Sequence, residues 1–320
     1  MTTKSISHHL WMDLPLVTYA FYSLGIAHAE ITNLEPQRLD LLPTAVFPLL
    51  IPWLIYALRW KNLDQSGRSA ALLLSVGTPA LIVLNYITNP RVVLDHHMLR
   101  QIYEGVAILN TVVLMLHARH WGRERILFFL GPALLYGLLL ENGGIILGYF
   151  TEMHYHLYAG PLPAPLATMS GWVTVFYIIT WVTWELQEHF PAIRRKPYLG
   201  GVIAVLAALC FDFQIDPIAT AVGFWTWHPS LDGGWLGVPI LNYVAWSAAV
   251  FPFAWLLFLR EKNQDLAPGG ISEPSHRNWM FSMVPVALLI AALLFLATMA
   301  LVEGGFAGPT FTILGEFLGI

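Results

Sequence analysis

Long apolar stretches divide the chain, and this pattern constrains its fold more than any other feature. A helix that crosses a lipid bilayer needs about 20 mainly apolar residues. Hydrophobic residues make up 57% of the 320 and charged residues 11%, a balance that a water-soluble domain could not carry on its surface. The sequence therefore predicts an all-α polytopic transmembrane helical bundle of about 8–9 spans. The stretches lie at about 14–29, 40–59, 69–88, 101–117, 126–150, 166–186, 199–222, 239–259 and 279–301.

No stretch resembles a soluble domain or a low-complexity linker, so residues 1–320 are expected to form a single integral membrane domain. The weakest stretch, 14–29, ends in Ala27-His28-Ala29, which resembles a leader cleavage site. Its leading segment carries one Lys and several polar residues, so we expect it to be retained as a span. The single cysteine, Cys210, excludes an intrachain disulfide and a cysteine-based metal cluster.

The basic residues predict the orientation of the bundle in the cell membrane, because Lys and Arg near span ends stay on the cytoplasmic side. If the N-terminus is cytoplasmic, that side holds 13 of the 16. The other side holds only Arg38, Arg91 and Arg100. The basic residues form short clusters instead of a stripe, which argues against nucleic acid as a partner. All four Lys residues lie outside the predicted spans, so a retinal Schiff base within the bundle is excluded.

Four polar residues are predicted to meet at the non-cytoplasmic rim: Glu141, Asp212, Asp216 and Asn242. Intramembrane carboxylates are costly and usually face the bundle interior. Asp212 and Asp216 are four residues apart and share a helix face, where their mutual repulsion favours a neutral carboxyl that can act as an acid. Gly143 and Gly144 after Glu141, and Pro217 after Asp216, predict that both helices loosen beside their acids. The alternative is that these acids make structural hydrogen bonds to neighbouring helices.

Aromatic residues fall near the same rim. Trp and Tyr rings can stabilise a cation, and they also form the aromatic belts found at span ends. Both interpretations remain open for each ring. The candidates for contact with a substrate are Tyr155, His156, Trp225, Trp227 and Trp246.

Together these residues form motifs that resemble a known family. The motifs are Glu141-x-x-Gly144 with Gly148 and Tyr155, Asp212-x-x-x-Asp216-Pro217, Gly223-x-Trp225-x-Trp227, and Gly237-Val238-Pro239-x-x-Asn242-x-x-x-Trp246. The segment from about 130 to 260 is similar to the membrane carotenoid-biosynthesis proteins, whose best-known members are carotenoid hydratases of the gamma-carotene and bisanhydrobacterioruberin type. The resemblance implies an all-helical hydro-lyase that adds water to the terminal isopropylidene double bond of an acyclic carotenoid, without a redox cofactor.

The residues are compatible with that reaction. Hydration of a trisubstituted alkene needs a proton donor, a stabilised tertiary cation and a positioned water molecule. Our hypothesis is that Asp216 or Asp212 protonates the alkene, that Glu141 is the other acid or positions the water, and that Asn242 completes the polar network. The expected partners are a long isoprenoid substrate and membrane lipid.

Three alternatives remain open at this stage. Another acid-initiated isoprenoid enzyme, a cyclase or an isomerase, shares the cation step but excludes water. A proton-coupled transporter or lipid-binding protein would use intramembrane acids as a relay. A divalent metal site is a further option, although no spacing among the 12 His matches a metal signature. Its candidate ligands are Asp95, His96, His97, His154, His156 and His228.

Overall fold

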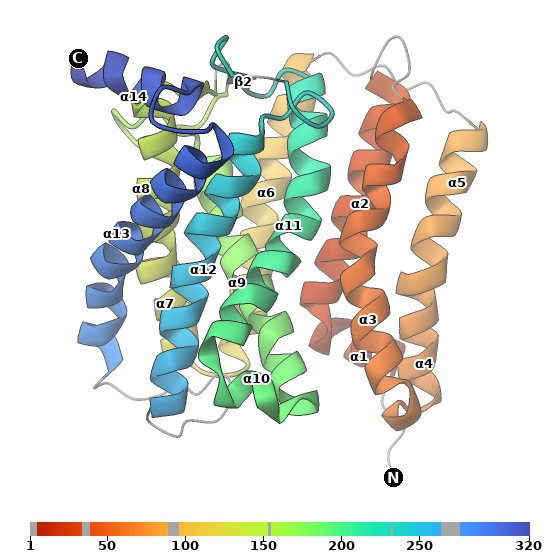
Figure 1. The fold of residues 1–320 in the computed structure, drawn as a ribbon. Coiled ribbons are helices and arrows are strands. Elements are labelled where there is room, and N and C mark those ends of the chain that lie inside the picture. Colours follow the sequence, from red (N-terminus) through yellow and green to blue (C-terminus); the bar gives the residue numbers. More distant parts are fainter. Residues whose placement is uncertain (1–4, 34–38, 89–95, 153–154, 232, 264–275) are drawn as a thin grey trace.

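Long helices packed side by side make up most of the chain in the computed structural model (Figure 1). The structure describes residues 1–320 except 1–4, 34–38, 89–95, 153–154, 232 and 264–275, and except the side chains of 26–33, 39–40, 42, 96–97, 99 and 276–278. The first elements are α1 (Ile6–Met12), α2 (Leu14–Asn33), η1 (Leu39–Leu49), α3 (Leu50–Arg59), η2 (Trp60–Asn62), α4 (Gln65–Leu72), η3 (Leu73–Gly77), α5 (Thr78–Thr88) and α6 (His96–Arg119). They are followed by α7 (Arg123–Phe128), η4 (Phe129–Ala133), α8 (Leu134–Ile146), β1 (Phe150–Thr151), α9 (Leu166–His189), α10 (Pro191–Arg195), α11 (Pro197–Ala221), β2 (Thr226–Trp227), α12 (Ile240–Asn263), α13 (His276–Val302) and α14 (Pro309–Leu318).

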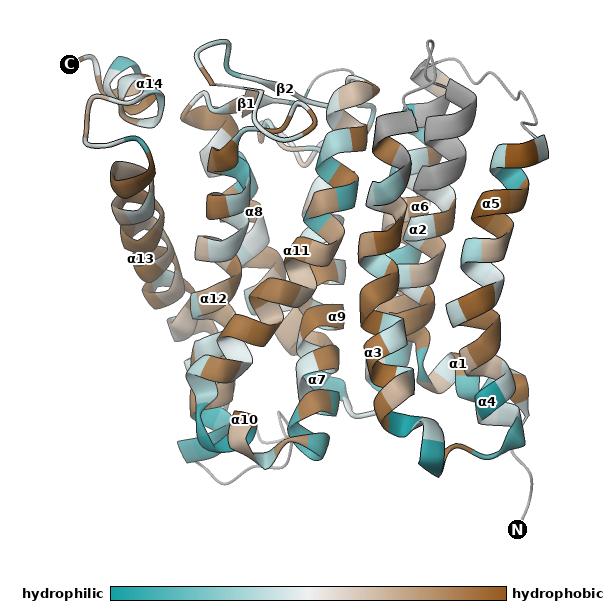
Figure 2. Cartoon of the chain, turned by 45° about the vertical axis from the view of Figure 1, so that its right-hand side comes forward, coloured by the Kyte–Doolittle hydropathy of each residue, from teal (hydrophilic) through white to brown (hydrophobic). Residues whose placement is uncertain are grey.

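The predicted class of fold is confirmed. In the described part of the chain, eight helical segments are long and apolar enough to cross a membrane, and the protein is an integral membrane protein. Figure 2 shows hydrophobic residues along the middle of the helices and hydrophilic residues around α4 and α10 at one end. The eight segments are Pro43–Asn62, Gln65–Thr88, Arg100–Arg119, Arg123–Ile146, Leu166–His189, Pro197–Ala221, Ile240–Asn263 and Trp279–Val302. The remaining predicted stretch, 14–29, coincides with α2, which lies beside α3 and α5 (Figure 1).

Helix α9 is the centre of the bundle. In the most apolar stretch of α9, 78% of the residues are buried, whereas the corresponding share for α13, at the periphery, is 22%. Its hydroxyl side chains are satisfied locally, since Thr183 Oγ1 donates to the Ile179 carbonyl at 2.8 Å. A polar contact also joins it to α6, where Thr111 Oγ1 lies 2.9 Å from Thr174 Oγ1. Hydroxyls that bond within or between helices are the usual way to bury polarity in a membrane bundle.

The prediction that two helices loosen beside their acids is wrong. Helix α11 continues through Asp216 and Pro217 to Ala221, and α8 continues through Gly143 and Gly144 to Ile146. A proline removes a single backbone hydrogen bond, and packing against neighbouring helices allows a membrane helix to keep its course. The α-helical hydrogen-bond pattern changes elsewhere, in the π-helical segments η3 and η4.

A small antiparallel β-pair closes one end of the bundle. Phe150 of β1 pairs with Trp227 of β2, and Thr151 pairs with Thr226. The pair ties the connection after α8 to the connection after α11, at the end where α12 begins (Figure 1). It therefore fixes loop residues directly over the helix ends that carry the predicted acids.

Candidate active site

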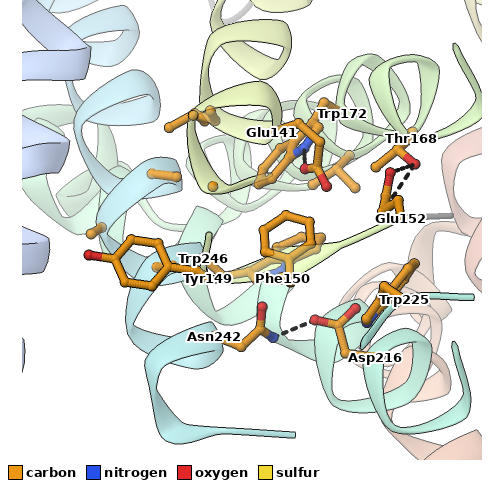
Figure 3. Close-up of a pocket in the computed structure, with 18 of the residues that line it drawn as sticks. Glu141, Tyr149, Phe150, Glu152, Thr168, Trp172, Asp216, Trp225, Asn242 and Trp246 are labelled. Carbon is orange, nitrogen blue, oxygen red and sulfur yellow. Dashed lines mark hydrogen bonds between the residues drawn. The ribbon is translucent and has the colours of Figure 1, made fainter. Parts of the chain in front are cut away.

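A cavity of about 360 Å³ lies at this end of the bundle, beneath the β-pair. Its size falls at the low end of the range of about 300–1,000 Å³ that is usual for ligand pockets. Most of its wall is apolar, and its polar groups are few and convergent (Figure 3). The polar and aromatic residues of the wall are Tyr22, Tyr103, Glu141, Tyr149, Phe150, Glu152, Thr168, Trp172, Thr174, Phe211, Asp216, Trp225, Trp227, Asn242, Trp246 and Phe295.

One carboxyl pair belongs to α11. Asp212 and Asp216 are separated by one helical turn, are 0% and 3% exposed, and both accept a hydrogen bond from the Nδ2 of Asn242. The bond to Asp212 Oδ1 is 2.8 Å long. Because both acids accept from one nitrogen, their carboxyls lie side by side. Asp216 forms part of the cavity wall, whereas Asp212 does not.

A second carboxyl pair lies on the opposite side of the cavity (Figure 3). The Nε1 of Trp172 on α9 donates to Glu141 Oε2 at 2.5 Å, and Thr168 Oγ1 donates to both oxygens of Glu152, at 3.1 and 3.0 Å. Glu152 follows β1 and lies outside the membrane-spanning segments. Burial, and then the negative charge of Glu141, raise the pKa of Glu152 well above its usual value.

Aromatic rings separate the two carboxyl pairs. Trp172 stacks on Trp246, with ring centroids 4.8 Å apart. The β-pair places Phe150 against Trp227 at 5.6 Å, and Trp225 lines the same wall. The Nε1 of Trp225 is buried and has no hydrogen-bond partner among the described residues. A molecule in the cavity would therefore meet carboxyl groups on two sides and aromatic rings between them.

The structure thus brings together most of the residues singled out from the sequence. Glu141, Asp216 and Asn242 line the cavity, as do Trp225, Trp227 and Trp246. Their common location results from the helix directions, because α8 and α11 end where α12 begins.

Besides Asp212, two predicted residues lie outside the cavity wall. Tyr155 is buried behind it, with its ring 6.4 Å from that of Tyr103 and 6.2 Å from that of Phe224. His156 is exposed, and its Nδ1 lies 2.7 Å from Glu104 Oε2. Glu104 also accepts the backbone N–H groups of His156 and Leu157, so it anchors this connection to α6.

Among the wall residues that sequence reasoning missed, Glu152, Thr168 and Trp172 form the second carboxyl pair and its hydrogen bonds. Glu152 lies within the segment that carries the family resemblance, and an acid beside that motif is the signal that could have identified it. Trp172 and Thr168 offered no comparable signal, since one Trp or Thr in an apolar span has many structural roles.

The metal candidates do not form a cluster in the described part of the chain, where no group of three or more potential ligands is close enough to hold an ion. Asp95 and His154 lie outside the described residues, as do the side chains of His96 and His97. His228 contacts Ser230, with Nδ1 2.7 Å from Oγ, and lies in the connection after β2.

Comparison with known proteins identifies the family of the chain. The sequence model of the family described as carotenoid biosynthesis protein matches residues 103–318, about two thirds of the chain. Neither the comparison with curated proteins nor the comparison with solved structures found a match. The matched region contains α8, α9, α11, α12 and α13, and with them both carboxyl pairs and almost the entire cavity wall. The chain therefore belongs to the carotenoid biosynthesis protein family.

Proposed function

We propose that the protein is a hydratase that adds water to the terminal isopropylidene double bond of an acyclic carotenoid. The observation that carries the proposal is the pairing of carboxyl groups on two sides of one apolar, aromatic cavity. Asp216 and Glu141 come from different helices and face the same space. Acid-initiated hydration needs such an arrangement, because one group must give a proton and another must accept one.

The first step is proton donation. In a poorly solvated site two adjacent carboxyls disfavour a double negative charge, so the Asp212–Asp216 pair retains a proton. Asp216 gives that proton to the terminal alkene, whose π electrons form the new C–H bond and leave a tertiary cation. Asn242 holds both carboxyls in position through its Nδ2.

The second step is capture of the cation. Trp172, Trp246 and Trp225 line the cavity, and an aromatic ring that meets the cation with its face stabilises it by about 0.5–2 kcal/mol. A water molecule held by Glu141 and Glu152 forms the C–O bond and passes one proton to this carboxyl pair. Exchange with bulk water resets both pairs, and no oxidant or reductant is consumed.

The proposal includes the orientation of the site. Basic residues gather at the bundle end that carries α1, α4 and α10, opposite the β-pair (Figure 1). Lys and Arg near span ends favour the cytoplasm. The cavity is accordingly assigned to the non-cytoplasmic half of the cell membrane. The basic residues concerned are Arg59, Lys61, Arg68, Arg119, Arg123, Arg125, Arg194, Arg195, Lys196, Arg260 and Lys262.

Isotope incorporation tests the reaction. Purified protein in lipid is incubated with lycopene in water enriched in oxygen-18, and the products are analysed by mass spectrometry. A hydratase gives a product heavier by one labelled water. A product of unchanged mass, whether cyclised or isomerised, would show that the protein catalyses another acid-initiated reaction instead of hydration. The absence of any product would reject the enzymatic assignment.

A further inference from the structure

Part of the cavity wall is also part of the outer surface of the bundle. Leu139 of α8 lines the cavity and is 41% exposed, and Ala292 of α13 lines it and is exposed as well. Both residues lie inside membrane-spanning segments, so the medium outside them is lipid. The cavity wall and the lipid-facing surface of the bundle therefore share residues of α8 and α13.

Small residues line this part of the wall. A Cβ added to Gly143, which lines the cavity, would meet nothing within 4 Å. At the next residue, Gly144, an added Cβ would collide with the ring of Phe150. Helix α13 contributes the small residues Ala291 and Ala292 to the wall.

Larger side chains make contacts above and below this part of the wall. Near the basic end of the bundle, the Phe281 ring comes within 3.0 Å of the position that a Cβ on Gly131 would occupy. Near the β-pair, Tyr149 and Phe295 lie with ring centroids 5.9 Å apart. We call the stretch of cavity wall between these two aromatic contacts, which includes Leu139, Gly143, Ala291 and Ala292, the window.

The size and chemistry of the cavity indicate what occupies the window. About 360 Å³ suits a drug-sized ligand, so it accommodates the end of a 40-carbon polyene and not its full length. The rest of such a chain is apolar and stays in the bilayer, from which leaving would be costly. A route through the loops would bring that apolar chain into water, whereas the residues of the window lie against the lipid.

We infer that the window between α8 and α13 is a second binding site, which holds the apolar chain of a long isoprenoid while its end occupies the cavity. The inference rests on the proposed function for the identity of the ligand. It adds that the substrate enters the cavity from the lipid, between the helices. It also adds that the residues which bind the apolar chain of the substrate are different from the carboxyl groups that act on its end.

Polyene binding tests the window independently of turnover. Asp216→Asn is used as the background so that lycopene is not converted, and binding is followed in lipid nanodiscs by the visible difference spectrum. Ala292→Trp and Gly143→Leu fill the window. Ala297→Trp, at an exposed position of α13 away from the cavity, and Gly105→Leu, at an open position of α6, are the matched controls.

Filling the window should weaken lycopene binding by about tenfold or more, since the loss of roughly 60 Å² of apolar contact corresponds to that factor. The controls should bind as the background does. If the window variants bind lycopene as tightly as the controls, the second site is rejected while the proposed function stands. If the unsubstituted protein does not bind lycopene, the carotenoid assignment fails and the window falls with it.

Discussion

Asp216 is the residue on which the proposed chemistry depends most directly. Asparagine has nearly the same shape, but it cannot supply the proton. Asp216→Asn should therefore lower the hydration rate by about 10²–10⁴-fold, the usual contribution of a general acid. The rate is measured with saturating lycopene in lipid.

Gln214 provides a control on the same helix. It is fully buried, its side-chain atoms have no partner among the described residues, and it does not line the cavity. Gln214→Leu should keep the hydration rate close to that of the unsubstituted protein. Equal rates in Asp216→Asn and Gln214→Leu would remove Asp216 from the mechanism.

Glu152 should link the stability of the protein to pH. Its raised pKa means that the folded protein binds a proton at pH values where an unfolded glutamate, with a pKa of about 4.3, has lost it. Stability is therefore greatest below the unfolded pKa and falls as the pH rises through the folded pKa. Glu152→Gln is neutral at all pH values and should flatten this decline, measured as Tm against pH in detergent.

The exposed residue Glu188 gives the comparison for this titration. Glu188→Gln should leave the dependence of Tm on pH as it is in the unsubstituted protein. Parallel curves for Glu152→Gln and the unsubstituted protein would contradict the assignment of a buried, neutral Glu152.

At the scale of helices, close packing of α8 against α9 positions Glu141. A Cβ on Gly137 would collide with the side chain of Trp172, which is the hydrogen-bond donor to Glu141. Gly137→Ala should therefore force the two helices apart at a cost of about 1–3 kcal/mol, the usual penalty of overpacking. The expected result is a lower Tm together with a lower hydration rate.

The matched substitution for this prediction is Gly105→Ala, because a Cβ at Gly105 meets nothing within 4 Å. It should leave both Tm and rate unchanged. A Gly137→Ala protein with the Tm of the Gly105→Ala protein would show that α8 and α9 are not held as closely as described.

Some local sequence rules predicted these helices correctly, and others did not. Hydropathy located the spans, since crossing a bilayer requires a long apolar segment whatever its neighbours are. The rule that a residue before proline leaves the helix failed at Asp216, because tertiary packing outweighs a local preference of this size. Which helix faces touch is a long-range property, so Trp172 beside Glu141 could not be inferred from spacing along the chain.

At the scale of the whole molecule, the directions of the helices decide which side chains meet at one end of the bundle. The directions of α8, α11 and α12, inferred from alternating spans, sufficed to predict that Glu141, Asp216 and Asn242 share one end. They did not predict Glu152, which lines the cavity from the connection that the β1–β2 pair and the hydrogen bonds from Thr168 hold in place. For residues on helices, the sequence thus predicted the end of the bundle at which they lie. The position of a residue on a connection depended on a contact between segments far apart in sequence, which the sequence did not predict.

The two ends of the bundle should therefore face different compartments. In a Cys210→Ala background, Ser230→Cys places a thiol on the connection after β2, near the cavity, and Lys196→Cys places one at the opposite, basic end between α10 and α11. Both positions are exposed. A membrane-impermeant maleimide added to intact cells should label position 230 and spare position 196 until the membrane is permeabilised, because basic span ends are retained in the cytoplasm. Labelling of 196 with protection of 230 would invert the protein and place the carboxyl pairs in the cytoplasmic half of the membrane.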